Sequence, residues 1–279
     1  MLIQMNVKRL NLIVFCFFSL ISIETMASGF PMGRRKTLLS PYFSYFASTS
    51  SRDLSGNKAP YGNNGRFSSV TAQIYLEYGI TDRLDFVAKI PFSFSQYQDD
   101  YLNNVNNAPS DLEVGLKYNI LHFNEQKYYF SAQALASIPA YSKNRNPATG
   151  YGKFGSELKL MISGSERSAY FNIEGGYRQY FGNPTGQVGQ LTYISTSGLH
   201  LGKSNQLVGE VSGVSSFRSS QFTPANPASN TEFTFVKANI AIGQRLWKEN
   251  WIFLGVFHDI VNRNSGIGEG GTLTGIFRF

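Results

Sequence analysis

Reactive side chains are scarce in this sequence. In 279 residues it has one cysteine, Cys16, and three histidines. Cys16 lies in an apolar stretch near the N-terminus that we expect to be removed, so the mature chain has no cysteine for a disulfide or for thiol chemistry. Acylation of Cys16, as in a lipoprotein, is the weaker alternative, because bulky Phe15 precedes it and the apolar stretch continues beyond it.

A hydrophobic run long enough to cross a bilayer as a helix is also missing. The longest apolar stretch, residues 10–23, has about fourteen residues, whereas a spanning helix needs about twenty. Lys8 and Arg9 precede this stretch, and Thr25-Met26-Ala27 follows it with small residues at the −3 and −1 positions of a cleavage site. These features predict a cleavable signal peptide over residues 1–27.

Charged residues make up only 15% of the chain, and acidic ones are in the minority. Loss of Lys8, Arg9 and Glu24 with the leader leaves 23 basic and 17 acidic residues, a net charge of +6. A basic surplus can indicate nucleic-acid binding, but an exported chain meets little nucleic acid. We therefore expect attraction to anionic lipid headgroups and no nucleic-acid partner. Residues 28–36, which end in the basic run Gly33-Arg34-Arg35-Lys36, are predicted as a short periplasmic stub.

Alternation of apolar and polar residues is the main feature that the sequence does contain. Residues 111–120 read D-L-E-V-G-L-K-Y-N-I, with an apolar residue at every second position, and residues 84–94 show the same period. A period of two residues predicts β-strands. The pattern continues over residues 37–279, and strands with one apolar and one ionic face are typical of a transmembrane β-barrel.

The connections between the predicted strands alternate in length. Short ones are predicted near residues 79–83, 121–127, 164–168, 201–205 and 244–250, and long polar ones near residues 48–65, 96–110, 140–152, 181–189, 217–231 and 262–270. Six long and five short links give about twelve antiparallel strands in an all-β, up-and-down barrel, with both termini on the short-turn side. Outer-membrane barrels have this asymmetry, with tight periplasmic turns and long outer loops.

Charged residues occupy the strand face that we assign to the barrel interior. A charge on the lipid face near the bilayer midplane costs about 2 to 4 kcal/mol, and the outward positions of the clear strands have none. Because both signs are present, we expect cross-strand ion pairs in place of the single-sign ring that selects an ion. Seven acidic and five basic residues are predicted to line the lumen: Glu77, Asp85, Lys89, Asp111, Glu113, Lys117, Glu157, Lys159, Glu174, Arg178, Glu210 and Lys237.

Aromatic residues mark the ends of the predicted strands. The chain ends on Phe279, preceded by the apolar residues Phe277 and Leu273. This ending resembles the assembly signal that the barrel-assembly machinery of Gram-negative outer membranes reads, so that machinery is an expected partner. An interfacial girdle is predicted from Tyr78, Tyr118, Tyr128, Tyr129, Trp247 and Trp251.

Several short motifs resemble those of one family. They are Pro109-Ser110-Asp111-Leu112-Glu113-Val114-Gly115-Leu116-Lys117-Tyr118, Ile138-Pro139, Thr149-Gly150-Tyr151-Gly152, Asn262-Arg263-Asn264 and Gly275-Ile276-Phe277-Arg278-Phe279. Over roughly residues 75–279 the chain is similar to the MetA-pathway of phenol degradation family of outer-membrane proteins. The resemblance implies a barrel that passes small, often aromatic, compounds. Ala140-Tyr141 stands where the family usually has Thr-Gly, so no role of that loop is carried over.

Some outer-membrane barrels are enzymes, and the three histidines test that possibility. His122 and His200 fall beside predicted short turns. His258 is predicted near the outer end of its strand, with Asp259 and Ser265 after it, so a serine activated by a base can be imagined there. The spacing does not reproduce the close histidine and serine motif of the barrel lipid hydrolases. We therefore predict no catalytic residue.

No cofactor or metal site is predicted either. The glycine-rich stretches at residues 182–186 and 266–271 lack a following Lys-Ser/Thr and a strand-to-helix context, so they do not indicate a phosphate-binding loop. Asp99-Asp100 has no further ligands at fixed spacing and does not indicate a cation site.

Together these features predict a β-barrel in the outer membrane of a Gram-negative bacterium, in contact with outer-membrane lipid and lipopolysaccharide. The leading functional hypothesis is a passive channel for a small hydrophobic or aromatic solute, with a narrow lumen. Two alternatives stay open. One is a structural or adhesive surface barrel whose paired charges hold it shut, and the less favoured one is an outer-membrane lipid hydrolase.

Overall fold

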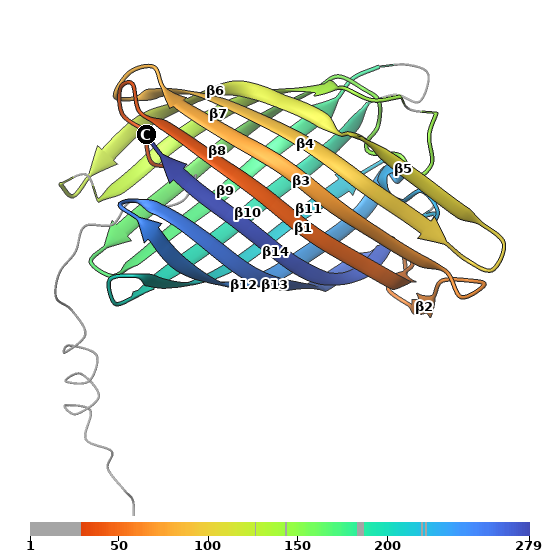
Figure 1. The fold of residues 1–279 in the computed structure, drawn as a ribbon. Helices are drawn as coiled ribbons and strands as arrows, with labels where there is room; N and C mark the ends of the chain where they lie inside the picture. Colours follow the sequence, from red (N-terminus) through yellow and green to blue (C-terminus); the bar gives the residue numbers. More distant parts are fainter. Residues whose placement is uncertain (1–28, 126, 143, 183–186, 219, 221) are drawn as a thin grey trace, which may run out of the picture.

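The computed structural model describes residues 29–125, 127–142, 144–182, 187–218, 220 and 222–279, so the predicted signal peptide lies outside the described residues. This part of the chain forms a closed β-barrel (Figure 1). Its helical structure is one 3₁₀ turn, η1 (Pro227–Ser229), and no helix in it is long and apolar enough to cross a membrane.

The predicted number of barrel strands is confirmed. Within the described residues, twelve antiparallel strands close the barrel: β1 (Thr37–Arg52), β3 (Arg66–Gly79), β4 (Leu84–Gln98), β6 (Asp111–Phe123), β7 (Tyr128–Pro139), β8 (Gly155–Glu166), β9 (Ala169–Tyr180), β10 (Val188–Leu201), β11 (Asn205–Phe217), β12 (Glu232–Trp247), β13 (Asn250–Arg263) and β14 (Ser265–Arg278). Two short strands in the long connections, β2 (Lys58–Pro60) and β5 (Asn103–Pro109), add to β1 and β4.

Strand β1 closes the barrel, because it pairs with β3 on one side and with β14 on the other. At the seam, the N–H groups of Thr37 and Phe279 donate to each other's carbonyl oxygens at 3.0 and 2.9 Å. Closure leaves no row of unpaired backbone groups, which lipid could not solvate. The C-terminus therefore lies beside the start of β1, at the end of the barrel with the short links (Figure 1).

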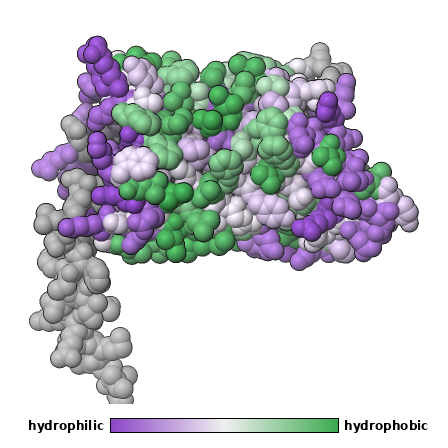
Figure 2. Space-filling view, viewed as in Figure 1, coloured by the Kyte–Doolittle hydropathy of each residue, from purple (hydrophilic) through white to green (hydrophobic). Residues whose placement is uncertain are grey.

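Side chains along each barrel strand point alternately into the barrel and out towards lipid, with a period of two residues. In β13 the side chains of Phe253 and Phe257 are 3% and 5% exposed, whereas those of Leu254 and Val256 are 69% and 62% exposed. Around the visible face, outward apolar residues form a hydrophobic band between two hydrophilic ends (Figure 2). A closed barrel with such a band suits lipid hydrocarbon, so the barrel spans a membrane.

Two clusters of buried apolar side chains lie inside the barrel. One is near the long connections and contains Tyr61, Phe67 and Tyr97. The other is near the short links and contains Leu38, Tyr170, Val208, Ala241, Trp251, Phe253 and Ile276. The prediction of Trp251 in an interfacial girdle is wrong, because this residue is 4% exposed. It shares the inward phase of β13 with Phe253, two positions along the strand.

The last hairpin also differs from the prediction. The sequence predicts a long loop over residues 262–270, but β13 continues to Arg263 and β14 begins at Ser265. Asn264 separates the two strands and has a φ of 50°. Beyond His258, the end of β13 pairs with β12, and the start of β14 pairs with β1. These polar and glycine-rich residues stay extended because the neighbouring strands supply their backbone partners.

Candidate functional site

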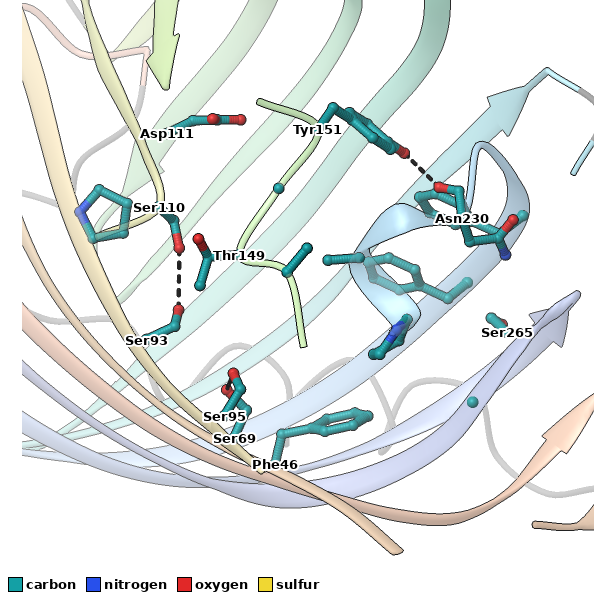
Figure 3. Close-up of a pocket in the computed structure, with 18 of the residues that line it drawn as sticks. Phe46, Ser69, Ser93, Ser95, Ser110, Asp111, Thr149, Tyr151, Asn230 and Ser265 are labelled. Carbon is teal, nitrogen blue, oxygen red and sulfur yellow. Dashed lines mark hydrogen bonds between the residues drawn. The ribbon is translucent and has the colours of Figure 1, made fainter. Parts of the chain in front are cut away.

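A cavity of about 490 Å³ lies inside the barrel, towards the long connections (Figure 3). Part of its wall consists of serine hydroxyls paired between neighbouring chain segments, Ser69 with Ser95 at 2.9 Å and Ser93 with Ser110 at 3.1 Å. In each pair one hydroxyl donates to the other, so each of these serines has a partner within the wall. Aromatic rings make up much of the remaining wall: Phe46, Tyr61, Phe67, Tyr151, Tyr180, Phe222, Phe233 and Phe235. The volume is in the range of small-molecule sites.

The long connections between β7 and β8 and between β11 and β12 border the cavity on its outer side. Their backbone and side chains are joined by hydrogen bonds to each other and to the segment before β6. Three of these bonds are Tyr151 Oη to the Asn230 carbonyl oxygen at 2.7 Å, the Ala148 N–H to Asn226 Oδ1 at 2.8 Å, and Thr149 Oγ1 to the Pro109 carbonyl oxygen at 2.9 Å. The described parts of these two connections are therefore joined to each other and to the barrel beside the cavity.

Two tyrosines in the β7–β8 connection donate hydrogen bonds from their hydroxyl groups. Burial raises the pKa of Tyr151 to about 12. Burial, and secondarily the charge of Asp111, also raises the pKa of Tyr141. Tyr141 Oη donates to Asp111 Oδ1 at 2.8 Å and accepts from the Gly152 N–H at 2.8 Å. The loop is thus anchored to the barrel wall through an inward carboxylate.

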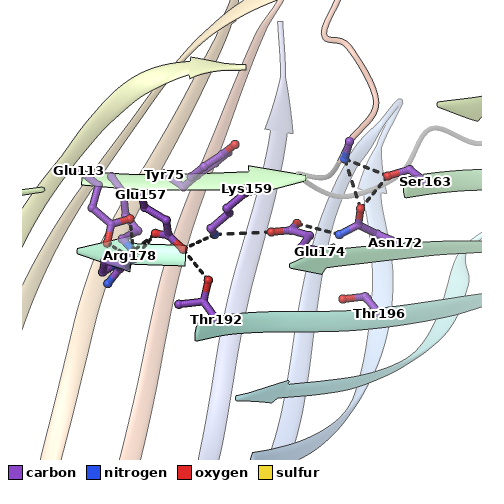
Figure 4. A network of polar contacts seen from close by, with 12 residues as sticks. Tyr75, Glu113, Glu157, Lys159, Ser163, Asn172, Glu174, Arg178, Thr192 and Thr196 are labelled. Atoms are coloured by element: carbon purple, nitrogen blue, oxygen red, sulfur yellow. Dashed lines mark hydrogen bonds and ion pairs between the residues drawn. The ribbon is translucent and has the colours of Figure 1, made fainter. Parts of the chain in front are cut away.

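An ionic network lies on the lumen side of β4, β6, β8 and β9, on the inner side of the cavity (Figure 4). Arg178 is at its centre, with Nη2 at 2.9 Å from Glu113 and 2.6 Å from Glu157. Glu113 also pairs with Lys89 at 2.6 Å, and Thr192 Oγ1 donates to Glu157 at 2.6 Å. Each carboxylate therefore has at least two partners, as buried charges require.

The network continues from Glu157 to the N-terminal segment. Lys159 lies 3.9 Å from Glu157 and 3.6 Å from Glu174, and Asn172 Nδ2 donates to Glu174 at 2.8 Å. The Gly29 N–H then lies 3.3 Å from Asn172 Oδ1. Figure 4 shows this continuous line of contacts across β8 and β9.

A second ionic cluster holds the same segment. Lys117 forms ion pairs with Glu77 and, at 3.3 Å, with Asp85, and its Nζ donates to the Phe30 carbonyl oxygen at 2.7 Å. The Met32 N–H donates to the Asp85 carboxylate at 3.2 Å. The described part of the predicted stub therefore enters the lumen and contacts the charges there through its backbone.

Three of the predicted lumen residues lie outside these two ionic groups. Asp111 accepts from Tyr141 and, at 3.2 Å, from Tyr180. Glu210 accepts from Thr196 at 3.4 Å. Lys237 lies over an aromatic ring. The other nine are brought together as described: Glu77, Asp85, Lys89, Glu113, Lys117, Glu157, Lys159, Glu174 and Arg178.

The histidine and serine of the imagined rim hydrolase lie on opposite faces of the barrel. His258 is 57% exposed on the outward face, with Nδ1 3.6 Å from Glu269. Asp259 and Ser265 are 6% and 9% exposed and line the internal cavity. His200 is buried against the ring of Trp251. In the described chain, no group of three or more His, Cys, Asp or Glu residues is placed to hold a metal ion.

The three residues of the predicted assembly signal lie at the seam of the barrel. Leu273 and Phe279 are exposed, and the ring of Phe277 lies 6.0 Å from that of Trp247. The aromatic cavity wall was not predicted from the sequence, although Thr149-Gly150-Tyr151-Gly152 is one of the quoted motifs. The lumen position of residues 29–32 could not be predicted, because backbone atoms make most of its polar contacts.

No protein-family model matches the sequence, and no curated protein sequence matches it. The fold is similar to that of several solved barrels. The COG4313 outer membrane channel from Pseudomonas putida F1 matches with a TM-score of 0.71 and 12% identity, over 92% of this chain and 100% of that chain. The NanC porin matches with a TM-score of 0.53 and 9% identity, over 85% and 98%.

The translocator domain of the autotransporter NalP from Neisseria meningitidis matches with a TM-score of 0.51 and 12% identity, over 88% of this chain and 89% of that domain. At these identities the similarities show the fold. That fold is the closed barrel of Gram-negative outer membranes, and the outward apolar residues on the barrel strands agree with a location in the outer membrane.

Proposed function

We propose that the chain is a passive outer-membrane channel for small, predominantly apolar solutes, aromatic compounds included. The observation that carries this proposal is the internal cavity, whose wall contains eight aromatic residues and two pairs of bonded serine hydroxyls. Of the charged residues in the same wall, Lys89, Glu113 and Arg178 are paired with one another. Such a wall gains little from a strongly hydrated solute and can bury an apolar one.

The charged part of the lumen is consistent with this proposal. Within the described network, three cations (Lys89, Lys159 and Arg178) face three carboxylates (Glu113, Glu157 and Glu174). Paired charges of both signs do not form the single-sign ring of an ion-selective filter. The network and the N-terminal segment therefore narrow the route without selecting a cation or an anion.

We also propose that the chain is a member of the MetA-pathway of phenol degradation family, and that lipid and the assembly machinery contact its outer surface. The resemblance to the MetA-pathway of phenol degradation family supports aromatic solutes, and its motif residue Tyr151 lines the cavity. Outer-membrane lipid and lipopolysaccharide would surround the apolar band. The exposed C-terminal residues Leu273 and Phe279 would be available to the barrel-assembly machinery during insertion.

The rival functions are less well supported. A lipid hydrolase at the rim would need His258 beside a serine, but Ser265 lies inside the barrel and His258 outside. We therefore propose a non-enzymatic barrel. A structural or adhesive barrel would need no internal cavity, so uptake measurements separate it from a channel.

Uptake of a labelled aromatic solute by cells tests the proposal. Phospholipid vesicles admit such solutes directly, so the assay needs cells with lipopolysaccharide in the outer leaflet. Cells that express this chain should take up labelled toluene several-fold faster than cells with an empty vector. Equal rates with correctly folded, heat-modifiable protein in the outer membrane would favour the structural alternative.

A cavity-filling variant sharpens this test. Ser93→Trp places a large ring in the cavity and should return uptake to near the empty-vector rate. Leu158→Trp adds the same ring on the outward face, where residue 158 is exposed, and should transport like the parent chain.

A further inference from the structure

Lys237 on β12 differs from the other four predicted lumen cations. It lines the cavity, and its Nζ lies 4.1 Å from the centre of the Phe257 ring. No carboxylate oxygen of the described chain lies within 4.0 Å of this nitrogen, whereas Lys89, Lys117, Lys159 and Arg178 all form ion pairs. Its ammonium group therefore has donor capacity directed towards the cavity.

Asp259 on β13 is the cross-strand neighbour of Lys237. Whereas Lys237 has an unused donor, Asp259 has an unused acceptor. It also lines the cavity and is 6% exposed. Its Oδ2 accepts from the Gly268 N–H at 2.9 Å, but its Oδ1 accepts no hydrogen bond from any described residue. The nearby amide of Asn262 donates instead to Ser265 and to a backbone carbonyl oxygen. A buried acceptor without a donor is costly, so Oδ1 is a place where a ligand donor would gain most.

Aromatic rings surround this pair of charges. The ring of Phe46 is stacked 6.4 Å from that of Phe257, and the rings of Phe233 and Phe235 are stacked 5.9 Å apart on β12. Phe46, Phe233 and Phe235 line the same cavity as Lys237 and Asp259, and Figure 3 shows Phe46 and Ser265 at its border. The site thus combines an apolar wall with one donor group and one acceptor.

We propose that Lys237 and Asp259 form a subsite for the hydroxyl group of a neutral solute with an apolar, ring-sized body. A hydroxyl donates one hydrogen bond and accepts others, so it can donate to Asp259 Oδ1 while it accepts from Lys237 Nζ. A carboxylate would place its charge against Asp259, and an ammonium would place its charge against Lys237. A pure hydrocarbon would leave Oδ1 without a donor. This subsite deepens the proposed channel function and names the preferred class of solute.

Four probes with the same apolar body test the proposal: 3-phenylpropanol, 3-phenylpropionate, 3-phenylpropylammonium and propylbenzene. Binding is measured by calorimetry to the full-length mature barrel in nanodiscs, and the heats of empty nanodiscs are subtracted. We expect the alcohol to bind about tenfold more tightly than each of the others, as one charge-assisted hydrogen bond provides. Equal affinities, or tightest binding of the acid or the amine, would overturn the proposal.

Two substitutions assign the preference to these residues. Asp259→Asn retains an acceptor for the Gly268 N–H but turns the other oxygen into a donor, so the preference for the alcohol over propylbenzene should fall about tenfold. Lys237→Met retains the packing on Phe257 and should also reduce the preference for the alcohol over propylbenzene. Lys203→Met removes an exposed charge from the β10–β11 turn and should leave the ranking unchanged. An unchanged ranking in Asp259→Asn would also overturn the proposal.

The binding experiment and the uptake experiment fail independently. Preferential binding of the alcohol by a barrel that transports no solute would refute the proposed channel and leave the subsite intact. Uptake of toluene without any preference among the four probes would support the channel and refute the subsite.

Discussion

At the scale of single residues, the lumen shows how the chain keeps many charges inside a barrel. Arg178 contacts Glu113 and Glu157 with one guanidinium group, a geometry that a planar fork of donors allows. Removal of one partner from a buried pair costs more than the pair itself contributes, because the other charge stays desolvated.

Arg178→Met should therefore destabilise the barrel by about 3 to 5 kcal/mol. The substitution keeps the bulk of the stem but removes the charge that Glu113 and Glu157 share. The free energy of unfolding is measured by urea titration of barrels refolded in lipid vesicles, with intrinsic tryptophan fluorescence as the signal. Arg83→Met is the matched control. Residue 83 is exposed in the β3–β4 turn, so its substitution should stay within about 0.5 kcal/mol of the parent. Equal stabilities of the two variants would show that the network contributes little.

At the scale of strands, glycines on the wall have different local surroundings. A Cβ atom at Gly115 of β6 would lie 1.9 Å from the Ala134 carbonyl oxygen of β7, whereas a Cβ atom at Gly209 of β11 would meet no atom within 4 Å. Gly115 permits close approach of β6 and β7, whereas the position of Gly209 has room for a side chain.

Gly115→Ala should lower the free energy of unfolding by about 1 to 3 kcal/mol, because β6 and β7 must move apart to admit the methyl group. Gly209→Ala should be neutral or slightly stabilising, since alanine reduces the conformational entropy of the unfolded chain. The urea titration in lipid vesicles measures both. A Gly115→Ala barrel as stable as the parent would mean that the strands adjust without cost.

The same scale shows what the sequence can predict. Strands with strict alternation, such as residues 84–94 and 111–120, lie within β4 and β6. Alternation does not define where a polar strand ends, so residues 262–270 were predicted as a loop. Alternation also does not show whether a residue beside a turn points into the barrel or out towards lipid. The sequence therefore does not predict that Trp251 points inward. Both errors occur where neighbouring strands, and not local sequence, determine the conformation.

At the scale of the whole molecule, the lumen is built from parts that are distant in the sequence. Periodicity places a charge on the inward face, but it does not pair Glu113 with Arg178, which are 65 residues apart. The cavity depends on loops from two connections, and the N-terminal segment enters the lumen through backbone contacts. Such contacts leave no pattern in the residue types, so the site was less predictable than the fold.

The N-terminal segment provides a test at this scale. The Gly29 N–H donates to Ser163 Oγ at 2.9 Å, and Ser131 Oγ donates to the Gly29 carbonyl oxygen at 2.5 Å. Deletion of residues 29–32 from the mature chain removes these contacts and those of Phe30 and Met32 with the ionic cluster. Single-channel conductance in planar bilayers should rise several-fold, because the segment occupies part of the narrow lumen.

A side-chain variant shows whether the backbone of residues 29–32 blocks the lumen or whether the apolar side chains of this segment are responsible. The double substitution Phe30→Ser and Met32→Ser keeps the backbone donors and acceptors that bind Lys117 and Asp85. It should leave the conductance close to that of the parent, although the ring contact of Phe30 with Tyr129 at 5.1 Å is lost. If the deletion conducts no better than the parent, the ionic network around Arg178 is the narrower barrier. If the double substitution conducts as well as the deletion, side-chain packing and not the backbone contacts holds the segment in place.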